Sequence, residues 1–514
     1  MSIRKQIIKN VSTNYATFFA SMAILFFMSP FVIHRLGDTA YGIWVLISSL
    51  TGYLSLLDFG ISGAVMKYVA EFNAKDNKEK LNKIVSASFL MFLIIGIVTF
   101  LITVFISLWV DNIFNLPGEY QGIAPILVMI IGSNIAIGFP MGVFGGIIRG
   151  HQRFDINSLY YFSILVVKSI LTVIFIGIGY GILALAIITV VTSFAGYVAQ
   201  MIIAYKVNPN IKIRLNNLDK GTFKLIFQFS FYMFILSIAA TLIFSSNPVI
   251  IGYFMVASAI TYYSIAAQLI EYTRQLISQM TAVLAPAVSH LDALGKNERI
   301  QEILIRGTRF SLMIALPIGI AFIVMGKPFI TLWMGEKYNQ SATILTILSI
   351  SFFGLLSQNI SYSILTGIGK LKAVAIQQIL TATANIILSA VMVRRYGLAG
   401  VAIGMVIPMI TAYIFWLPIY ITRVVKIPYI KYFREAFRPP CVAAVPFTCL
   451  IIFFRIFLYP ENYAVFFSEI ASSTILFVIC SFYLCFEMEK RKALLFKLVP
   501  LKEWIRKVCR MAIT

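Results

Sequence analysis

Four ionisable residues stand inside long hydrophobic stretches of the sequence, and they are its strongest candidates for chemistry. Arg274 has Glu271 three positions before it, so the two side chains share one face if this stretch is helical. Lys168 lies in ILVVKSILTVIF with no acidic neighbour, and Asp58 lies in LSLLDFG. Charged groups in hydrocarbon cost about 2.5–3.5 kcal/mol on insertion scales, so they normally face a water-filled cavity or a partner. Arg274 and Lys168 therefore predict a cationic cavity that binds an anionic group of a substrate.

Each of these residues also has a purely structural interpretation. A buried Asp–Lys or Asp–Arg pair would lock two helices together without any transport role. Asp58 and Glu271 fit either salt-bridge partners or proton-carrying coupling groups, and the sequence leaves both roles open. No metal site or disulfide scaffold is expected, because the three histidines are far apart and no cysteine has a metal-ligand spacing.

The composition requires that hydrophobic helices position these groups. Of 514 residues, 60% are hydrophobic and 12% are charged, whereas soluble domains carry about 25% charged residues. One membrane crossing needs about 20 apolar residues. The apolar runs predict an all-α integral membrane protein of about fourteen transmembrane helices, with spans at 10–33, 40–68, 84–110, 123–148, 159–179, 182–205, 222–245, 249–283, 307–327, 341–367, 373–393, 398–422, 440–458 and 467–487.

The net charge of +22 would suggest nucleic acid in a soluble protein. Here we expect no nucleic-acid partner, since cytoplasmic loops of membrane proteins collect Lys and Arg. With a cytoplasmic N-terminus, the basic residues expected on the opposite side are only Arg35, Lys327, Lys337, Arg394, Arg395 and Arg455. This asymmetry predicts two cytoplasmic termini in the cell (inner or plasma) membrane. The basic segment 487–514 is expected to be an amphipathic anchor on anionic lipid.

The chain resembles itself at a spacing of about 220 residues. The clearest match is between YGILALAI at 180–187 and YGLAGVAI at 396–403. Six helices per half predict two parallel repeats, related by an axis along the membrane normal. We therefore expect an N-terminal six-helix lobe at 1–207 and a C-terminal six-helix lobe at 208–424. Two extra helices and the basic tail would follow at 425–514.

The segment from Phe31 to Asn77 resembles the opening of the polysaccharide-biosynthesis flippases, which include O-antigen flippases. That family belongs to the multidrug/oligosaccharidyl-lipid/polysaccharide exporter superfamily. The characteristic sequence pattern of the family is Arg-Leu-Gly at the end of the first helix, followed by Tyr-Gly and then by Leu-Leu-Asp-Phe-Gly. The matching residues are Arg35, Leu36, Gly37, Tyr41, Gly42, Leu57, Asp58, Phe59 and Gly60.

The resemblance implies a two-lobed bundle whose first, second, seventh and eighth helices line a central cavity. It implies a flippase, not an enzyme, that moves a polyprenyl-diphosphate-linked oligosaccharide to the outer leaflet by alternating access. Arg274, Lys168 and Arg35 would bind the diphosphate, while Asp58 and Glu271 would couple transport or form salt bridges. In the lipid II branch, the last two helices form an apolar groove for the lipid tail. In this chain, spans 440–458 and 467–487 would wall such a groove.

No cofactor is expected, and coupling to Na⁺, to H⁺ or to the membrane potential stays open. The expected partners are the glycan lipid, the bilayer and other polysaccharide-assembly membrane proteins. One rival function is a multidrug or organic-cation extruder, which would need an acidic cavity. Another is a membrane glycosyltransferase or polymerase, for which Asp111 and Glu119 are the one acidic pair in the outer loops. A scaffold without transport activity is the third.

Overall fold

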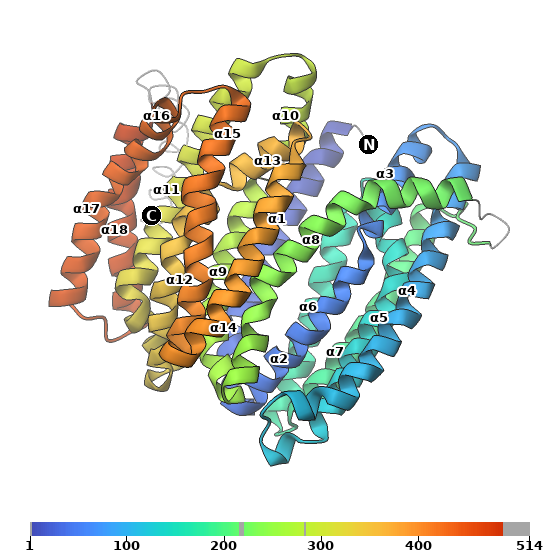
Figure 1. Ribbon diagram of the computed structural model, residues 1–514, viewed down its shortest axis with the longest axis horizontal. Coiled ribbons are helices and arrows are strands. Elements are labelled where there is room, and N and C mark those ends of the chain that lie inside the picture. The colour runs from blue at the N-terminus through green and yellow to red at the C-terminus, as the bar shows by residue number, and fades with distance from the viewer. Residues whose placement is uncertain (1–2, 215–219, 282–283, 487–514) are drawn as a thin grey trace, which may run out of the picture. The chain divides into compact units, whose positions relative to one another are not determined.

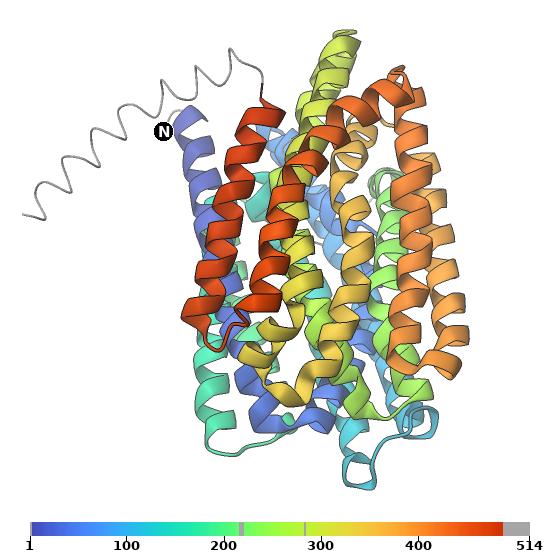
Figure 2. The ribbon, with the colours of Figure 1, turned by 90° about the vertical axis from the view of Figure 1, so that its left-hand side faces the viewer.

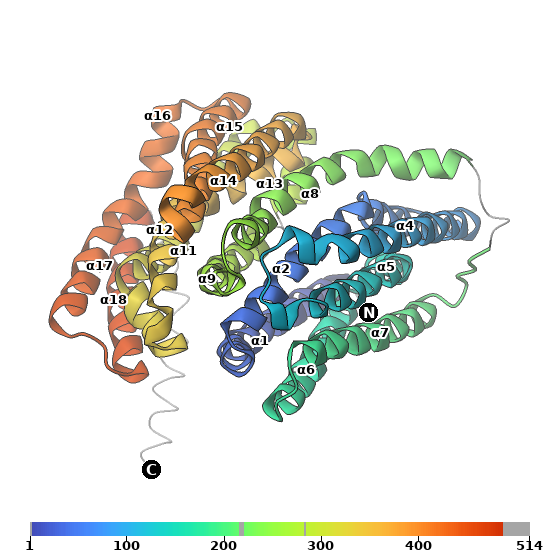
Figure 3. The ribbon, with the colours of Figure 1, turned by 60° about the horizontal axis from the view of Figure 1, so that its bottom comes forward.

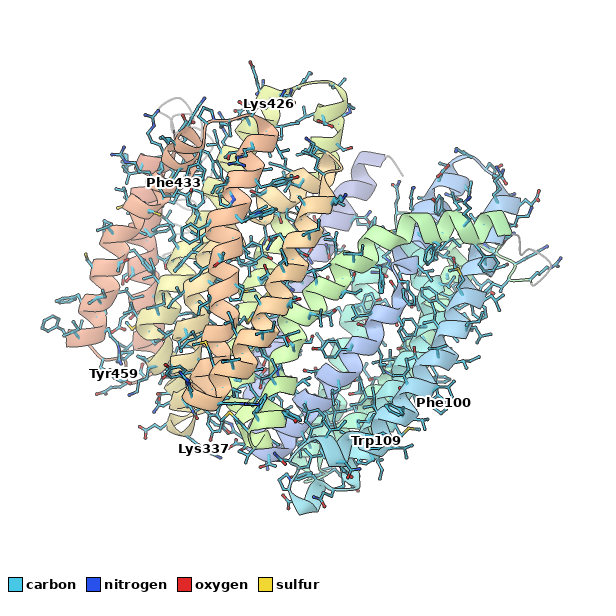
Figure 4. The ribbon with its side chains drawn as sticks, viewed as in Figure 1. Phe100, Trp109, Lys337, Lys426, Phe433 and Tyr459 are labelled. Atoms are coloured by element: carbon cyan, nitrogen blue, oxygen red, sulfur yellow. The ribbon has the colours of Figure 1, made fainter. Side chains whose placement is uncertain are left out.

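The computed structural model describes residues 3–214, 220–281 and 284–486, and the described part contains helices and no β-strand (Figure 1). Twelve helical spans in it are long and apolar enough to cross a membrane. Large apolar side chains point away from these helices, such as the exposed Phe100 and Trp109 of α4 (Lys78–Ile113) in Figure 4. Exposed apolar surface on this scale indicates contact with lipid. The predicted all-α, multi-pass membrane fold is confirmed, and the predicted anchor at 487–514 lies outside the described residues.

The chain forms two compact units. The first comprises Met1–Ile265 and Ala375–Met405, and the second comprises Ala266–Val374 and Val406–Thr514. The chain passes between the units at three points, one inside α9 (Ala257–Thr281) and two inside α14 (Leu371–Ile410). The lobes at 1–207 and 208–424 follow from the sequence repeat and stay a prediction.

The first unit is built on α5, which lies between α4 and α7 (Figure 3). The α1 helix packs against α6, and α2 packs against α8. Fully buried Val65, Val143 and Ile147 belong to one apolar cluster that joins α3 to α5. Besides α4 and its parts of α9 and α14, this unit contains α1 (Ile3–Leu36), α2 (Asp38–Leu54), η1 (Ser55–Asp58), α3 (Ile61–Ala74), η2 (Gly118–Tyr120), α5 (Ile123–Gly150), α6 (Phe154–Gly177), α7 (Ile182–Val207) and α8 (Lys220–Phe254).

The second unit is built on α11, which packs against both α12 and α17. The α17 and α18 helices run side by side (Figure 2). Buried Met325, Phe447 and Phe477 belong to the cluster that joins these helices. Besides its part of α9 and α14, this unit contains α10 (Leu284–Ala293), α11 (Asn297–Met334), η4 (Glu336–Tyr338), α12 (Asn339–Ser357), α13 (Asn359–Gly367), η5 (Thr411–Trp416), α15 (Leu417–Val425), α16 (Tyr429–Tyr432), η6 (Phe433–Phe437), α17 (Arg438–Phe457) and α18 (Tyr463–Cys485).

The helix predicted at 40–68 is broken, and this correction bears on the site. The α2 helix ends at Leu54, η1 carries the chain to Asp58, and α3 begins at Ile61. Phe59 and Gly60 between them adopt left-handed backbone angles, with φ of 48° and 77°. A residue in that region cannot continue a right-handed helix, and glycine tolerates it best. The LLDFG motif therefore marks a turn and not the interior of a helix.

Other boundaries also differ from the predicted spans. The spans at 222–245 and 249–283 are α8 and α9, whose junction falls at residues 255–256. The span at 341–367 contains two helices, α12 and α13. The spans at 373–393 and 398–422 join in α14, where Gly397 alone leaves helical geometry with φ 56° and ψ −136°. Hydropathy could not place the junction of α8 and α9, because Met255, Val256 and their neighbours are apolar. The other two breaks follow polar residues, Gln358 in one case and Arg394 with Arg395 in the other.

Candidate functional site

Two of the candidate residues, Arg274 and Glu271, lie on α9 and are hydrogen-bonded to each other. The Arg274 Nε donates to Glu271 Oε2 at 2.6 Å, and Arg274 Nη2 donates to Glu271 Oε1 at 2.7 Å. Gln275 Nε2 also donates to Glu271 Oε1, at 2.8 Å. The Arg274 and Glu271 side chains are 32% and 33% exposed. Arg274 and Glu271 thus form a bidentate ion pair that remains partly exposed.

The sequence of α9 explains why this group is held at its surface. Ile270, Thr273 and Ile277 are buried on one side of the helix, at spacings of three and four residues. Glu271, Gln275 and Ser278 follow the opposite side, which is partly or fully exposed. This helix is about 37 Å long at 1.5 Å per residue, which is enough to cross the hydrocarbon core. It is absent from the twelve apolar spans, which indicates that one of its faces needs a polar environment.

Tyr413 and Tyr362 extend the polar surroundings of Arg274 within the second unit. Tyr413 stands in η5, a π-helical turn, and both Arg274 and Tyr362 act electrostatically on its hydroxyl group. Insertions of this kind within helices occur frequently at functional sites. No local pattern indicates η5, because TAYIFW is as apolar as its neighbours.

Asp58 holds the turn between η1 and α3. Its Oδ1 accepts hydrogen bonds from Ser62 Oγ at 2.7 Å and from Ser62 N at 3.3 Å. The Ser62 amide is one of the first in α3, where no carbonyl of the helix can accept from it, so this carboxylate caps the helix. Arg149 of α5 acts electrostatically on the same carboxylate, although the described residues place no basic side chain at ion-pair distance from it. Sequence reasoning missed Arg149, which it counted as a loop residue.

Lys168 lies near the middle of α6 and is half-buried. Its carbonyl oxygen accepts from Thr172 Oγ1 at 2.8 Å. No acidic side chain lies at ion-pair distance from its amine within those residues. The α6 helix packs between α1 and α7, in the first unit. A cavity role for Lys168 therefore stays a prediction.

Arg35 occupies the last turn of α1 and is exposed. The chain reverses directly after it at Gly37, whose φ is 82° and requires glycine. A cation in the last turn of a helix also interacts favourably with the helix dipole. Of the five candidate residues, the structure joins Arg274 to Glu271. Among the described residues, Arg35, Asp58 and Lys168 form no hydrogen bond or ion pair with one another.

Asp111 performs a structural task in the loop that joins α4 to α5 in the first unit. Its Oδ2 accepts from the Gly122 amide at 2.9 Å, which closes the connection between α4 and α5. Glu119 is exposed in the same loop. Among the described residues, no three His, Cys, Asp or Glu side chains come together as a metal site would require. The loop thus gives no support to the glycosyltransferase alternative.

Two buried acids escaped sequence reasoning. Asp155, 1% exposed at the start of α6, pairs with Lys9 Nζ and with Arg153 Nε, each at 3.0 Å. The Asp155 amide also donates to Asn10 Oδ1 at 3.1 Å. Together with the Lys9 ion pair, this hydrogen bond connects the start of α1 to the start of α6. Glu469 is buried in α18. An acid inside an apolar run was the available signal for Glu469, and the last two helices were interpreted only as walls for a lipid tail.

Comparison with known proteins agrees with this architecture. The family model described as "Polysaccharide biosynthesis protein" matches residues 35–343, which is more than half of the chain. A "Putative O-antigen transporter" of Shigella flexneri is 24% identical, over 73% of this chain and 88% of that protein. The predicted family is confirmed.

Two solved structures share the fold. The structure titled "Lipid II flippase MurJ, inward closed conformation" has a TM-score of 0.70 and 16% identity, over 92% of this chain and 98% of that one. An inward-facing multidrug resistance MATE family transporter has a TM-score of 0.65 and 18% identity, over 82% of this chain and 99% of that one. Both likenesses concern the fold alone.

Proposed function

The chain belongs to the polysaccharide biosynthesis protein family, and we propose that it is a flippase for a polyprenyl-diphosphate-linked oligosaccharide. It would move this lipid from the cytoplasmic to the outer leaflet by alternating access, in the cell membrane and with both termini cytoplasmic. The observation that carries the proposal is α9, a helix of membrane length whose polar face presents the Arg274–Glu271 pair. Other membrane proteins of polysaccharide assembly would supply and consume the lipid.

The proposal includes fourteen membrane crossings. Twelve spans are apolar enough to be recognised, and one of these, Leu371–Val425, has 55 residues with Gly397 at its break. A span of that length holds two crossings. The polar α9 supplies the remaining crossing, because a helix that lines a water-filled cavity need not be apolar on that face.

A repeated backbone supports two parallel six-helix halves. Three left-handed turns in the first half recur about 220 residues later. Asp76 and Gly295 both precede a long helix, and Gln152 and Gly369 both precede the fifth helix of their half. Gly179 and Gly397 precede the sixth helix of theirs. Positive φ angles occur at only twelve described residues, so the recurrence of three of them at the spacing of the sequence repeat favours a common origin.

Arg274 would bind the diphosphate by exchanging its partner. In the unloaded protein, Glu271 neutralises the guanidinium and lowers the cost of holding a charge at membrane depth. A diphosphate offers a similar bidentate geometry with more negative charge, so it competes with the carboxylate for the guanidinium. Gln275, which already donates to Glu271, would keep that carboxylate solvated during the exchange. We propose that Lys168 and Arg35 add positive charge along the path.

The membrane potential can supply the driving force. Moving about two negative charges outward across roughly 100 mV, negative inside, is favourable by about 4–5 kcal/mol. The polyprenyl tail would stay in lipid while the head group passes through the cavity. Coupling to Na⁺ or H⁺ through Asp58 or Glu271 is compatible with the same scheme.

Reconstitution into liposomes tests the substrate class. The purified protein would be given a fluorescent short-chain polyprenyl diphosphate disaccharide, and a membrane-impermeant quencher would report its leaflet. We expect protein-dependent flipping, and a membrane potential that is positive outside should accelerate it. In parallel, the same vesicles would be loaded with a fluorescent organic cation. Cation efflux without flipping would replace the flippase with the extruder, whose fold this chain shares.

A further inference from the structure

A groove of about 690 Å³ opens between α17 and α18, beside the loop that joins them. The aromatic side chains of Phe454 and Phe457 line its α17 side, and Tyr459 lines it at the end of α17, where Figure 4 labels this residue. Ser468 and Ser472 line its α18 side. The groove therefore has one apolar wall and one polar wall, which is the pattern of a site for an amphiphile.

Glu469 lies in the polar wall of this groove, and no other described residue pairs with its carboxyl group. Its side chain is 4% exposed, and neither carboxyl oxygen has a hydrogen-bond partner among the described residues. A buried carboxyl group without a hydrogen bond costs several kcal/mol, so such groups nearly always have a partner or face a ligand. The groove is the side from which a partner for Glu469 can come, because Glu469 is one of its lining residues.

The charge of the groove selects the kind of ligand. Glu461 is a second acid in the lining, and no Lys or Arg of the described residues lines the groove. Arg455 of α17 is placed over the Tyr459 ring instead, 4.7 Å from its centre. Two acids disfavour a head group of net negative charge, and therefore the groove does not suit the diphosphate of the proposed substrate, which has no cationic group of its own. A cationic head group that donates hydrogen bonds satisfies both the charge and the unpaired oxygens.

The groove lies where the bilayer offers such head groups. Phe457, Tyr463 and Phe467 are exposed around it, as expected for a surface in contact with lipid. Glu469 is about two helical turns, or roughly 9 Å, from the start of α18 at Tyr463. A helix end and its aromatic residues mark the edge of the membrane, so this carboxyl group lies close below the head-group layer.

We propose that this groove binds a membrane lipid with a primary ammonium head group, of the phosphatidylethanolamine type. Its N–H groups would donate to Glu469, and its acyl chains would follow the apolar wall formed by Phe454 and Phe457. The bound lipid acts as a fixed ligand of the last two helices. This site is independent of the transported substrate and of the Arg274–Glu271 pair.

Lipid retention in nanodiscs tests the proposal. The full-length protein would be placed in nanodiscs of equal parts phosphatidylethanolamine, phosphatidylcholine and phosphatidylglycerol, then extracted and analysed by native mass spectrometry. Phosphatidylcholine is the decisive competitor, since its quaternary ammonium carries the same charge but has no N–H donor. We expect retained phosphatidylethanolamine to exceed each competitor by about tenfold, in line with charge-assisted hydrogen bonds.

Variants connect that preference to the groove. Glu469→Gln keeps the shape and removes the charge, so the preference should fall by about tenfold towards none. Glu119→Gln removes an exposed acid from another loop and should retain the wild-type preference. If Glu469→Gln does not yield a monodisperse protein, Ser472→Trp fills the groove from an exposed position and should abolish the preference. Equal retention of the three lipids, or a preference unchanged in both groove variants, overturns the proposal.

Discussion

Replacing Glu271 with glutamine should strengthen the binding of a diphosphate lipid, although it removes a charged residue from the candidate site. Glu271 holds Arg274 through two hydrogen bonds of 2.6 and 2.7 Å. In the exchange scheme, the substrate must displace this carboxylate before it can reach the guanidinium. The Glu271→Gln variant removes the competing charge, while its amide can still accept a hydrogen bond from Gln275.

The size of this effect follows from the exposure of the pair. Fully exposed ion pairs contribute about 0–1 kcal/mol, and hydrogen bonds to buried charged groups contribute about 1.5–3 kcal/mol. The Arg274 and Glu271 side chains are each about one-third exposed, so a value of about 1–2 kcal/mol is expected. The dissociation constant of the substrate should therefore fall by about 5- to 30-fold.

Binding of a water-soluble, short-chain polyprenyl diphosphate disaccharide by isothermal titration calorimetry measures this change. The matched control is Glu302→Gln on α11, which removes a carboxylate three residues from Arg299, where the pair distance is 2.9 Å. That control should bind like the wild type. An unchanged or weaker affinity in Glu271→Gln would refute the exchange of partners at Arg274.

Three further predictions concern stability and are checked by thermal unfolding in detergent. Asp155→Ala should lower the free energy of unfolding by about 1–3 kcal/mol, because Lys9 and Arg153 both lose the carboxylate with which they pair. The loss is limited because both basic side chains can be hydrated instead. An unchanged melting temperature would contradict the role of Asp155 in joining α1 to α6. Asp58→Ala should cost about 0.5–2 kcal/mol through the lost cap of α3, and a variant as stable as the wild type would show that this cap is dispensable. Gly42→Val should cost about 1–3 kcal/mol or more, because a side chain there would collide with the Ala257 carbonyl group. Gly52→Val on the same helix meets open space, so equal losses in the two glycine variants would contradict the close-packing argument.

Much of the architecture was predictable, because hydropathy indicates the membrane helices and a sequence motif indicates the family. Apolar runs placed most of the membrane helices, and the match from Arg35 to Gly60 identified the family. The break at 55–60 lay inside that same motif. A family motif reports which residues are kept without saying which backbone angles they adopt, so Asp58 was assigned to a helix interior and found in a turn.

The local chemistry was less accessible from the sequence. Glu271 and Arg274 are three residues apart, so helix geometry alone predicted their pair. Arg149 comes close to Asp58 only through the packing of α5 against α3, which no local pattern encodes. The junction of α8 and α9 falls at Met255 and Val256, two residues that give no turn signal. Tertiary packing determines such neighbours and junctions, and no single segment of the sequence predicts them.

The central claim is that Arg274 carries an anionic lipid head group across the membrane, and flipping by Arg274 variants tests it most directly. In proteoliposomes with an imposed potential, positive outside, Arg274→Ala should slow flipping of the diphosphate lipid by at least about tenfold. Arg299→Ala, which removes the arginine of the comparable pair on α11, should leave the rate unchanged. Equal rates for wild type, Arg274→Ala and Arg299→Ala, in proteins of equal stability, would contradict the account.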